Sequence, residues 1–315
     1  MNLVKRSLLT IVAVASSFVA TAQTMDDAGA SFNNAVKLIE TDVNGAIGAF
    51  KSTITICDKV GTDADELKKQ SMAQIPGLYY RLVLKSNEEK DFQGAIDGCQ
   101  PALEAAGAYN DEATKTAVEK LLPQLYLALG LEQFKVKDYT NAEVSFSKSL
   151  ELDPGNLQTM DFKMKVYGVT DNLSKLSETF DAMVAIDANS PFVAKGKEFA
   201  AKRYGYAGAK ALKGKNYTEA ADLLSKATTY SEDAKTYNYL GIAYNSIKKW
   251  DNAIMAFNKA IELETKDKSD LFFQLGTALQ GKGDNDGACE AFKKVTTGPN
   301  VKGAEYQIKQ VLKCK

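Results

Sequence analysis

Four cysteine thiols are the side chains of this chain best able to do covalent or metal chemistry, because the sequence contains no histidine. Without imidazole, Ser-His-Asp and Cys-His catalysis and histidine-ligated zinc are excluded. The thiols stand too far apart for a C-x-x-C motif, at Cys57, Cys99, Cys289 and Cys314. Four thiolates around zinc would be the remaining metal site, but small buried apolar residues are the favoured interpretation. We therefore expect no metal and no cofactor.

Carboxylates indicate little more chemistry. Asp284-Asn285-Asp286-Gly287 is similar to part of a calcium loop, but Lys282 and Lys293 stand where the first ligand and the bidentate glutamate belong. A capped turn between two helices is the simpler interpretation, and no glycine-rich phosphate loop occurs. An enzyme with two catalytic carboxylates stays open as an alternative, although no particular pair indicates one. We expect no catalytic residues and no enzyme.

The elements that position the cysteine and carboxylate side chains must come from a repeating sequence pattern. In this pattern small and apolar residues recur at fixed positions of each repeat, which we call columns. Its best unit begins at residue 234 and carries Tyr237, Leu240, Gly241, Tyr244, Ala253, Phe257 and Ala260. Glycine and alanine at fixed positions let two antiparallel helices approach closely, and the aromatic columns fill the space between hairpins. The columns recur at about 76–109, 123–156, 201–234 and 269–302, with half a unit around Ala46 and Phe50 and a degenerate unit at 157–190.

The spacing of these columns resembles the tetratricopeptide repeat, a helix–turn–helix unit of about 34 residues. The resemblance implies an all-α fold, a right-handed superhelical solenoid of antiparallel helix pairs that serves as a protein-binding scaffold. After Lys302, Tyr306, Ile308, Val311 and Leu312 alternate with polar residues. This alternation predicts an amphipathic helix that caps the end of the stack.

Turns and insertions refine this prediction. Asp or Asn before a second helix predicts a side-chain cap, whereas Trp250 follows an uncapped turn and is expected to be a buried staple. Extra residues at 61–75, 110–122 and 191–200 are expected to lengthen first helices. Together with the degenerate unit, the last insertion predicts an N-terminal arm, 23–190, and a C-terminal arm, 191–315.

The N-terminus has the parts of a secretory signal peptide over residues 1–22. Lys5 and Arg6 precede an apolar stretch from Leu8 to Val19, and Ala20-Thr21-Ala22 fits a cleavage site. The cut resembles those of Bacteroidota signal peptides, which predicts a periplasmic location. Cleavage would change the formal charge from −1 to −3, which disfavours a nucleic-acid partner. No further run after residue 22 is apolar and long enough to predict a membrane span.

The resemblance also implies which residues face a protein or peptide partner. The first helices of such repeats line the groove, and the corresponding residues here are Lys202, Lys213, Lys235, Asn238, Asn245, Phe273 and Gln280. The lysine and asparagine clamp of members that bind chaperone tails is absent, since Tyr206 and Tyr239 occupy clamp positions. A module that binds glycan or peptidoglycan and a structural homo-oligomer remain alternatives, and the capped end favours a monomer.

The thiols of Cys289 and Cys314 are expected to form a disulfide. Cys289 lies near the start of the last second helix, and an antiparallel helix after Gly298-Pro299 would return Cys314 to that point. A disulfide requires a Cα separation of roughly 4.4–6.8 Å, which this path allows. Cys57 and Cys99 lie on second helices of neighbouring units and are less well placed to pair.

Overall fold

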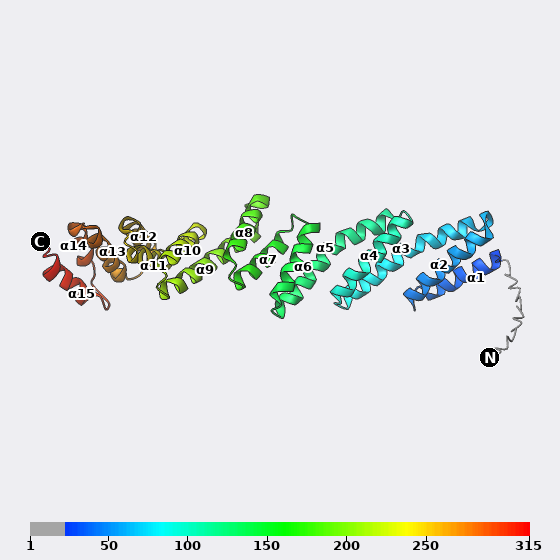
Figure 1. Ribbon diagram of the computed structural model, residues 1–315, viewed down its shortest axis with the longest axis horizontal. Helices are drawn as coiled ribbons and strands as arrows, with labels where there is room; N and C mark the ends of the chain where they lie inside the picture. Colours follow the sequence, from blue (N-terminus) through cyan, green and yellow to red (C-terminus); the bar gives the residue numbers. More distant parts are fainter. Residues whose placement is uncertain (1–22) are drawn as a thin grey trace, which may run out of the picture. The chain divides into compact units, whose positions relative to one another are not determined.

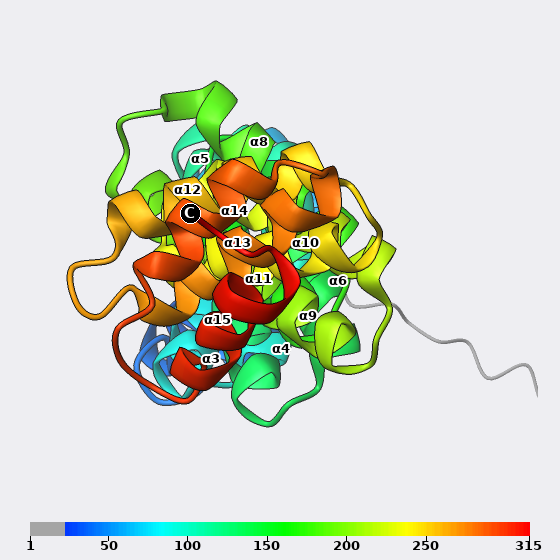
Figure 2. The ribbon, with the colours of Figure 1, turned by 90° about the vertical axis from the view of Figure 1, so that its left-hand side faces the viewer.

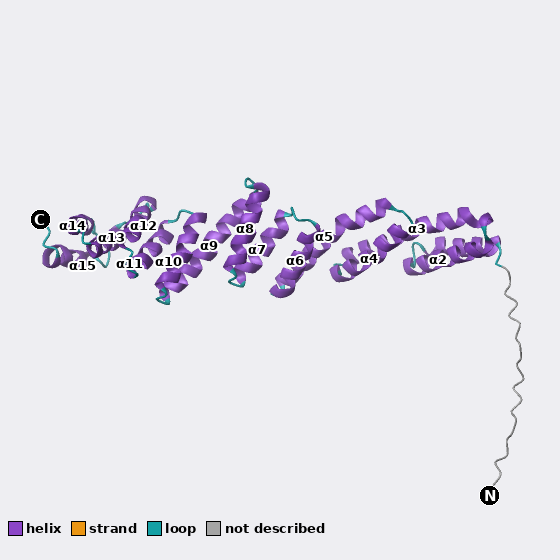
Figure 3. Ribbon diagram, turned by 45° about the horizontal axis from the view of Figure 1, so that its top comes forward, coloured by secondary structure: helices purple, strands orange, loops and turns teal. Residues whose placement is uncertain are grey.

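A computed structural model describes residues 23–315, and these residues form helices and turns without any strand (Figures 1 and 3). The expected all-α fold of antiparallel helix pairs is confirmed. The predicted signal peptide at 1–22 lies outside the described residues. The chain divides into two compact units, with the boundary between Leu122 and Pro123.

The first unit contains two helical hairpins joined by a 3₁₀ turn, η1 (Thr62–Ala64). α1 pairs with α2, and α3 pairs with α4. α5 contains the boundary between the units. The helices are α1 (Met25–Leu38), α2 (Val43–Val60), α3 (Asp65–Glu88), α4 (Phe92–Ala108) and α5 (Glu112–Lys135).

In the second unit, consecutive hairpins pack against each other, and a short C-terminal helix and a π-helical turn follow them. The helices are α6 (Tyr139–Leu152), α7 (Leu157–Val169), α8 (Leu173–Asp187), α9 (Pro191–Lys213), α10 (Tyr217–Tyr230), α11 (Ala234–Ser246), α12 (Trp250–Leu263), α13 (Ser269–Lys282), α14 (Asn285–Lys293) and α15 (Val301–Tyr306), with η2 at Gln307–Val311. Residues 191–200 form the first turns of α9, as the sequence predicts.

One contact recurs in the hairpins of the second unit. A glycine of the first helix faces a large side chain of the second helix, which stands sixteen residues later in each case. A Cβ atom added to Gly241 would lie 2.5 Å from the Phe257 ring. Glycine is therefore required here by the close approach of two helices. The pairs are Gly130 with Phe146, Gly208 with Leu224, Gly241 with Phe257, and Gly276 with Phe292.

The turns inside the hairpins share a second feature, a side-chain cap on the second helix. The Asp284 carboxylate accepts a hydrogen bond from the Gly287 backbone N–H at 2.9 Å, and Asp91 and Asp138 cap α4 and α6 in the same way. Asn216 and Lys249 stand at the same place before α10 and α12, and neither provides a side-chain cap, so the cap expected at Asn216 is not formed. Trp250 is half-buried, whereas the sequence predicts it to be buried. Its ring lies over Gly281 near the end of α13.

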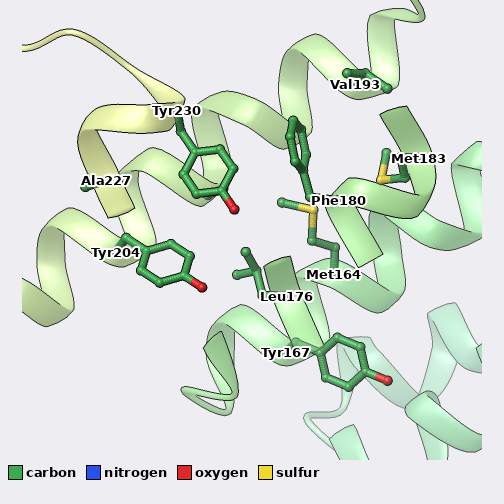
Figure 4. Packing of buried hydrophobic residues seen from close by; sticks show 10 residues of the cluster. Met164, Tyr167, Leu176, Phe180, Met183, Val193, Tyr204, Ala227 and Tyr230 are labelled. Atoms are coloured by element: carbon green, nitrogen blue, oxygen red, sulfur yellow. The ribbon is translucent and has the colours of Figure 1, made fainter. Parts of the chain in front are cut away.

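The core of the second unit continues across residues 190 and 191. Met164 and Phe180 of α7 and α8 share one apolar cluster with Tyr204 and Tyr230 of α9 and α10 (Figure 4). The Tyr230 ring lies 5.2 Å from that of Phe180 and 5.6 Å from that of Tyr204. Packing is thus continuous where the sequence places a division between two arms, and that two-arm division stays a prediction.

The C-terminal segment covers the last hairpin. Figure 2 shows α15 in red. Gly303 of α15 lies against Phe273 of α13, and Ile308 and Leu312 pack with Phe292 in one cluster. Cys289 and Cys314 form a disulfide with a Cα separation of 5.8 Å, and this is the pair that the sequence singles out. Cys57 and Cys99 are buried free thiols, and burial raises the pKa of Cys99 to about 11.

Replacement of Gly241 by alanine is expected to destabilise the second unit by about 1–3 kcal/mol, because the added methyl group would overlap the Phe257 ring. Gly205 provides a matched control in α9, since its added Cβ would meet only the Thr236 hydroxyl at 3.9 Å. Gly205→Ala should stabilise the unit by about 0.5–1 kcal/mol through helix propensity. Urea titration followed by circular dichroism measures both, and equal changes would contradict the close-approach argument.

The substitution Lys249→Asp should stabilise α12 by about 1 kcal/mol, because it supplies the side-chain cap that this turn lacks. Asp284→Ala should cost a similar amount at α14. Thermal melts of the two variants measure opposite shifts in Tm. A lower Tm for Lys249→Asp would contradict the prediction, because it would show that the Lys249 side chain stabilises the protein more than the new cap does.

Loss of the Cys289–Cys314 disulfide should loosen the C-terminal segment. The bridge joins residues separated by 25 positions, and the chain-entropy model assigns such a loop about 3 kcal/mol. Hydrogen exchange of residues 301–314 should quicken in dithiothreitol. The double variant Cys289→Ser/Cys314→Ser should exchange quickly with or without reductant. If dithiothreitol leaves the hydrogen-exchange rate of the wild type unchanged, the predicted effect of the disulfide on this segment is wrong.

Candidate functional site

A hollow in the second unit lies between the first helices of two neighbouring hairpins, α9 and α11. It has a volume of about 680 Å³. We call it the α9–α11 groove. Its walls come from α9, from the start of α11 and from the end of α10, namely Glu198, Ala201, Lys202, Gly205, Tyr206, Ala209, Ala227, Ser231, Asp233, Lys235, Thr236 and Tyr239.

The α9 wall follows from helix periodicity. Lys202, Tyr206 and Ala209 lie four and three residues apart, so their side chains share one face of the helix. Gly205 and Ala209 carry little or no side chain, and they leave space between α9 and α11. Tyr206 is 62% exposed, although a tyrosine ring gains by burial. On α9, Gly205 and Ala209 therefore form the floor of the groove, and the exposed Tyr206 ring stands at its rim.

The α11 wall is held by a cap at its N-terminus. The Asp233 carboxylate accepts hydrogen bonds from the backbone N–H and the hydroxyl of Thr236, both at 2.8 Å. The Lys235 ammonium lies 5.7 Å from the centre of the Tyr239 ring, a cation–π distance. Glu198 and Asp233 line the groove together with Lys202 and Lys235, so acidic and basic side chains are balanced in its lining.

The residues predicted to face a partner fall into three groups. Lys202 and Lys235 line the α9–α11 groove together. Lys213 is exposed on the same face of α9, two turns beyond Tyr206. Asn238 and Asn245 lie on α11 and are half-buried, and their Oδ1 atoms are buried without a hydrogen-bond partner among the described residues.

Phe273 and Gln280 form the third group and lie away from this groove. The Phe273 ring lies 5.6 Å from the Phe292 ring and would meet any Cβ added at Gly303 of α15. The Gln280 amide donates a hydrogen bond to the Gln307 side chain at 3.2 Å. The chain's own C-terminal segment therefore contacts both residues on the face that the repeat pattern leaves open for a partner.

Tyr206 and Tyr239 are groove residues that the sequence did not single out for binding. Their position relative to Lys202 and Lys235 carried a signal, since each tyrosine stands four residues after a lysine on a first helix. Four residues place two side chains on one helix face. Of the two rings, that of Tyr206 is exposed, whereas that of Tyr239 is half-buried and also packs against the apolar cluster around Leu240.

A second polar cluster joins α6, α7 and α8. The Glu143 carboxylate accepts hydrogen bonds from the Lys175 ammonium and the Tyr167 hydroxyl, both at 2.9 Å. Lys175 holds the pKa of Glu143 below its usual value, and burial lowers the pKa of Lys163 beside it. The Lys175–Glu143 ion pair and the Tyr167 hydrogen bond to the same carboxylate tie the three helices together.

Over residues 23–315, no group of three or more cysteine or acidic side chains lies close enough to hold a metal ion. The same part of the chain contains no helix with the length and apolar character needed to cross a bilayer. What the α9–α11 groove offers is a shaped surface with apolar, aromatic and cationic contacts.

Comparison with solved structures returns helical proteins of low identity. A crystal structure of MamA shares 23% identity with a TM-score of 0.37, covering 61% of this chain and 97% of that one. A tetratricopeptide repeat protein from Parabacteroides merdae shares 14% identity with a TM-score of 0.27, covering 90% and 97%. The P58(IPK) TPR domain shares 12% with a TM-score of 0.33, covering 92% and 80%.

Comparison with family models gives a sharper result. No curated protein matches the chain. The tetratricopeptide repeat model matches residues 123–156 and 234–267, and both segments begin where the column pattern of the sequence places a unit. The second segment contains the Gly241–Phe257 contact and α11, which forms one wall of the groove. Two segments of the chain therefore match the tetratricopeptide repeat, a type of helix pair that typically mediates contacts between proteins.

Proposed function

We propose that this protein is a non-catalytic binding scaffold whose α9–α11 groove holds a segment of a protein or peptide partner. The observation that supports the proposal is the groove itself, where small residues form the floor and Tyr206 stands exposed beside Lys202 and Lys235. Small-residue floors accept inserted side chains, while exposed tyrosine and lysine contribute contact area and hydrogen bonds at a rim.

The proposal extends to the setting of the protein. The features of residues 1–22 support export to the periplasm, where the scaffold would act as a monomer in the cell envelope. The coverage of α13 by α15 supports a monomer, because the last hairpin already packs against its own chain. The proposed scaffold has no nucleic-acid partner, no cofactor and no catalytic role.

A glycan-binding module is the second candidate, and one observation favours it. Sugar sites use exposed aromatic rings in a cleft, and Tyr206 and Tyr239 line the same groove. Against it, the Tyr239 ring is already engaged by the Lys235 ammonium. Peptide binding therefore remains the proposal, and competition by soluble peptidoglycan fragments distinguishes the two.

A photo-crosslinking residue in place of Tyr206 should capture a discrete protein partner in cells of the native host. Met255 on α12 gives a matched control, since it is 64% exposed and Tyr206 is 62% exposed. Gel shift and mass spectrometry identify the product, which should disappear when Ala209→Trp fills the groove.

The result is read from three comparisons. A product specific to position 206 that Ala209→Trp removes supports the scaffold. The same products at positions 206 and 255, or none at 206, would contradict it. Loss of the protein product on addition of soluble peptidoglycan fragments would favour the glycan module instead.

A further inference from the structure

Residues 299–315, which we call the C-terminal segment, cover α13 with few buried contacts of their own. Ala304 is the one residue of this segment that is buried, and its apolar neighbours Ile308 and Leu312 stay half-buried. The helix α12, by comparison, buries four residues. Because the segment removes little apolar surface from water, it depends on its covalent bond to α14 to stay in place.

That bond is the disulfide between Cys289 and Cys314. Cys289 is buried and Cys314 is half-buried, so a reductant reaches the Cys314 sulfur first. A thiolate of a dithiol attacks Cys314 Sγ, and Cys289 Sγ leaves as a thiolate that takes up a proton from water. The second thiol of the reductant then attacks the mixed disulfide, which frees the Cys314 thiol and closes a disulfide within the reductant. Two electrons thus pass from the dithiol to the protein disulfide.

Release of the C-terminal segment would uncover one face of α13. Asp270, Phe273, Thr277 and Gln280 lie within about 80° of one another around this helix. Besides the contacts on Phe273 and Gln280 described above, the Asn300 amide donates a hydrogen bond to the Asp270 carboxylate at 3.0 Å. Release therefore opens a carboxylate acceptor, an aromatic ring and an amide donor on the same helix face.

This face of α13 is complementary to itself. Asp270 and Gln280 stand five residues on either side of Leu275, and Phe273 and Thr277 stand two residues on either side of it. When α13 of a second copy packs antiparallel about a two-fold axis at this midpoint, Asp270 faces the partner's Gln280 and Phe273 faces the partner's Thr277. An amide then donates to a carboxylate at both ends of the contact, and the two helix dipoles oppose each other. A parallel arrangement would instead place the two Asp270 carboxylates together.

We propose that reduction of the Cys289–Cys314 disulfide by a dithiol releases the C-terminal segment and lets α13 pair with α13 of a second copy in this antiparallel arrangement. A second copy fits the face because the acceptor and the donor that release frees stand at equal distances from one midpoint. The oxidised chain stays the monomer of the proposed function. The α9–α11 groove takes no part in the pairing, so the inference goes beyond that function.

Light scattering of the full chain after residue 22, with and without dithiothreitol, tests the inference. The oxidised chain should have the mass of a monomer, and the reduced chain should approach the mass of a dimer as its concentration rises. The double variant Cys289→Ser/Cys314→Ser should dimerise without reductant. Circular dichroism shows that each sample is folded, and a non-reducing gel distinguishes a covalent dimer through the two remaining thiols, Cys57 and Cys99.

Two substitutions of Gln280 in the double variant test the contact itself. Gln280→Glu should weaken dimerisation by about tenfold or more, because it places a carboxylate opposite Asp270 at both ends of the contact. Gln280→Lys should preserve or tighten the dimer, because an ammonium can pair with that carboxylate. If Gln280 only supported the fold of α13, both substitutions would act in the same direction.

Three outcomes would overturn the proposal. A reduced chain and a double variant that both stay monomeric would show that the uncovered face does not bind a second copy. A dimer of the oxidised chain would show that the disulfide does not control association. If Gln280→Glu and Gln280→Lys weaken the dimer alike, the copies pair through another surface. Each result is independent of the crosslink at position 206, so the scaffold proposal is tested separately.

Discussion

The close approach of two helices at a glycine is the contact on which the rest of the second unit depends. At Gly241 the Phe257 ring occupies the space of a missing side chain, and the same arrangement recurs at Gly208 and Gly276. A hairpin closed in this way has its large side chain fully buried within itself. Its remaining apolar columns then pack against the next hairpin, so one local contact sets the spacing of the stack.

Close packing within each hairpin also explains why the groove forms between hairpins. The second helices bury their large residues, such as Phe257 and Leu224, against glycines of the first helices. The first helices α9 and α11 then face each other through Gly205, Ala209 and Thr236, which are too small to fill the space between them. The groove is thus a consequence of small residues on first helices, and at its rim Tyr206 is exposed while Tyr239 also packs against the core.

The C-terminal segment shows how the same surface changes when a further helix follows. α13 presents Phe273 and Gln280 where α11 presents Asn238 and Asn245, but α15 and η2 cover them. The Cys289–Cys314 disulfide holds this cover in place. A groove remains between the first helices α9 and α11, whereas the first helix α13 packs against α15.

The sequence by itself determined the helical hairpins, their glycine contacts, most of their capped turns and the amphipathic tail, because each of these depends on residues close together in the chain. It also brought Cys289 and Cys314 together through the length of one returning helix. Only the tertiary structure decided which first-helix residues stay open. Phe273 and Tyr206 both stand on first helices, yet one contacts α15 and the other is exposed. The exposure of a helical residue depends on which segment packs against it. That segment can be distant in the sequence, so the spacing of residues along the helix does not predict it.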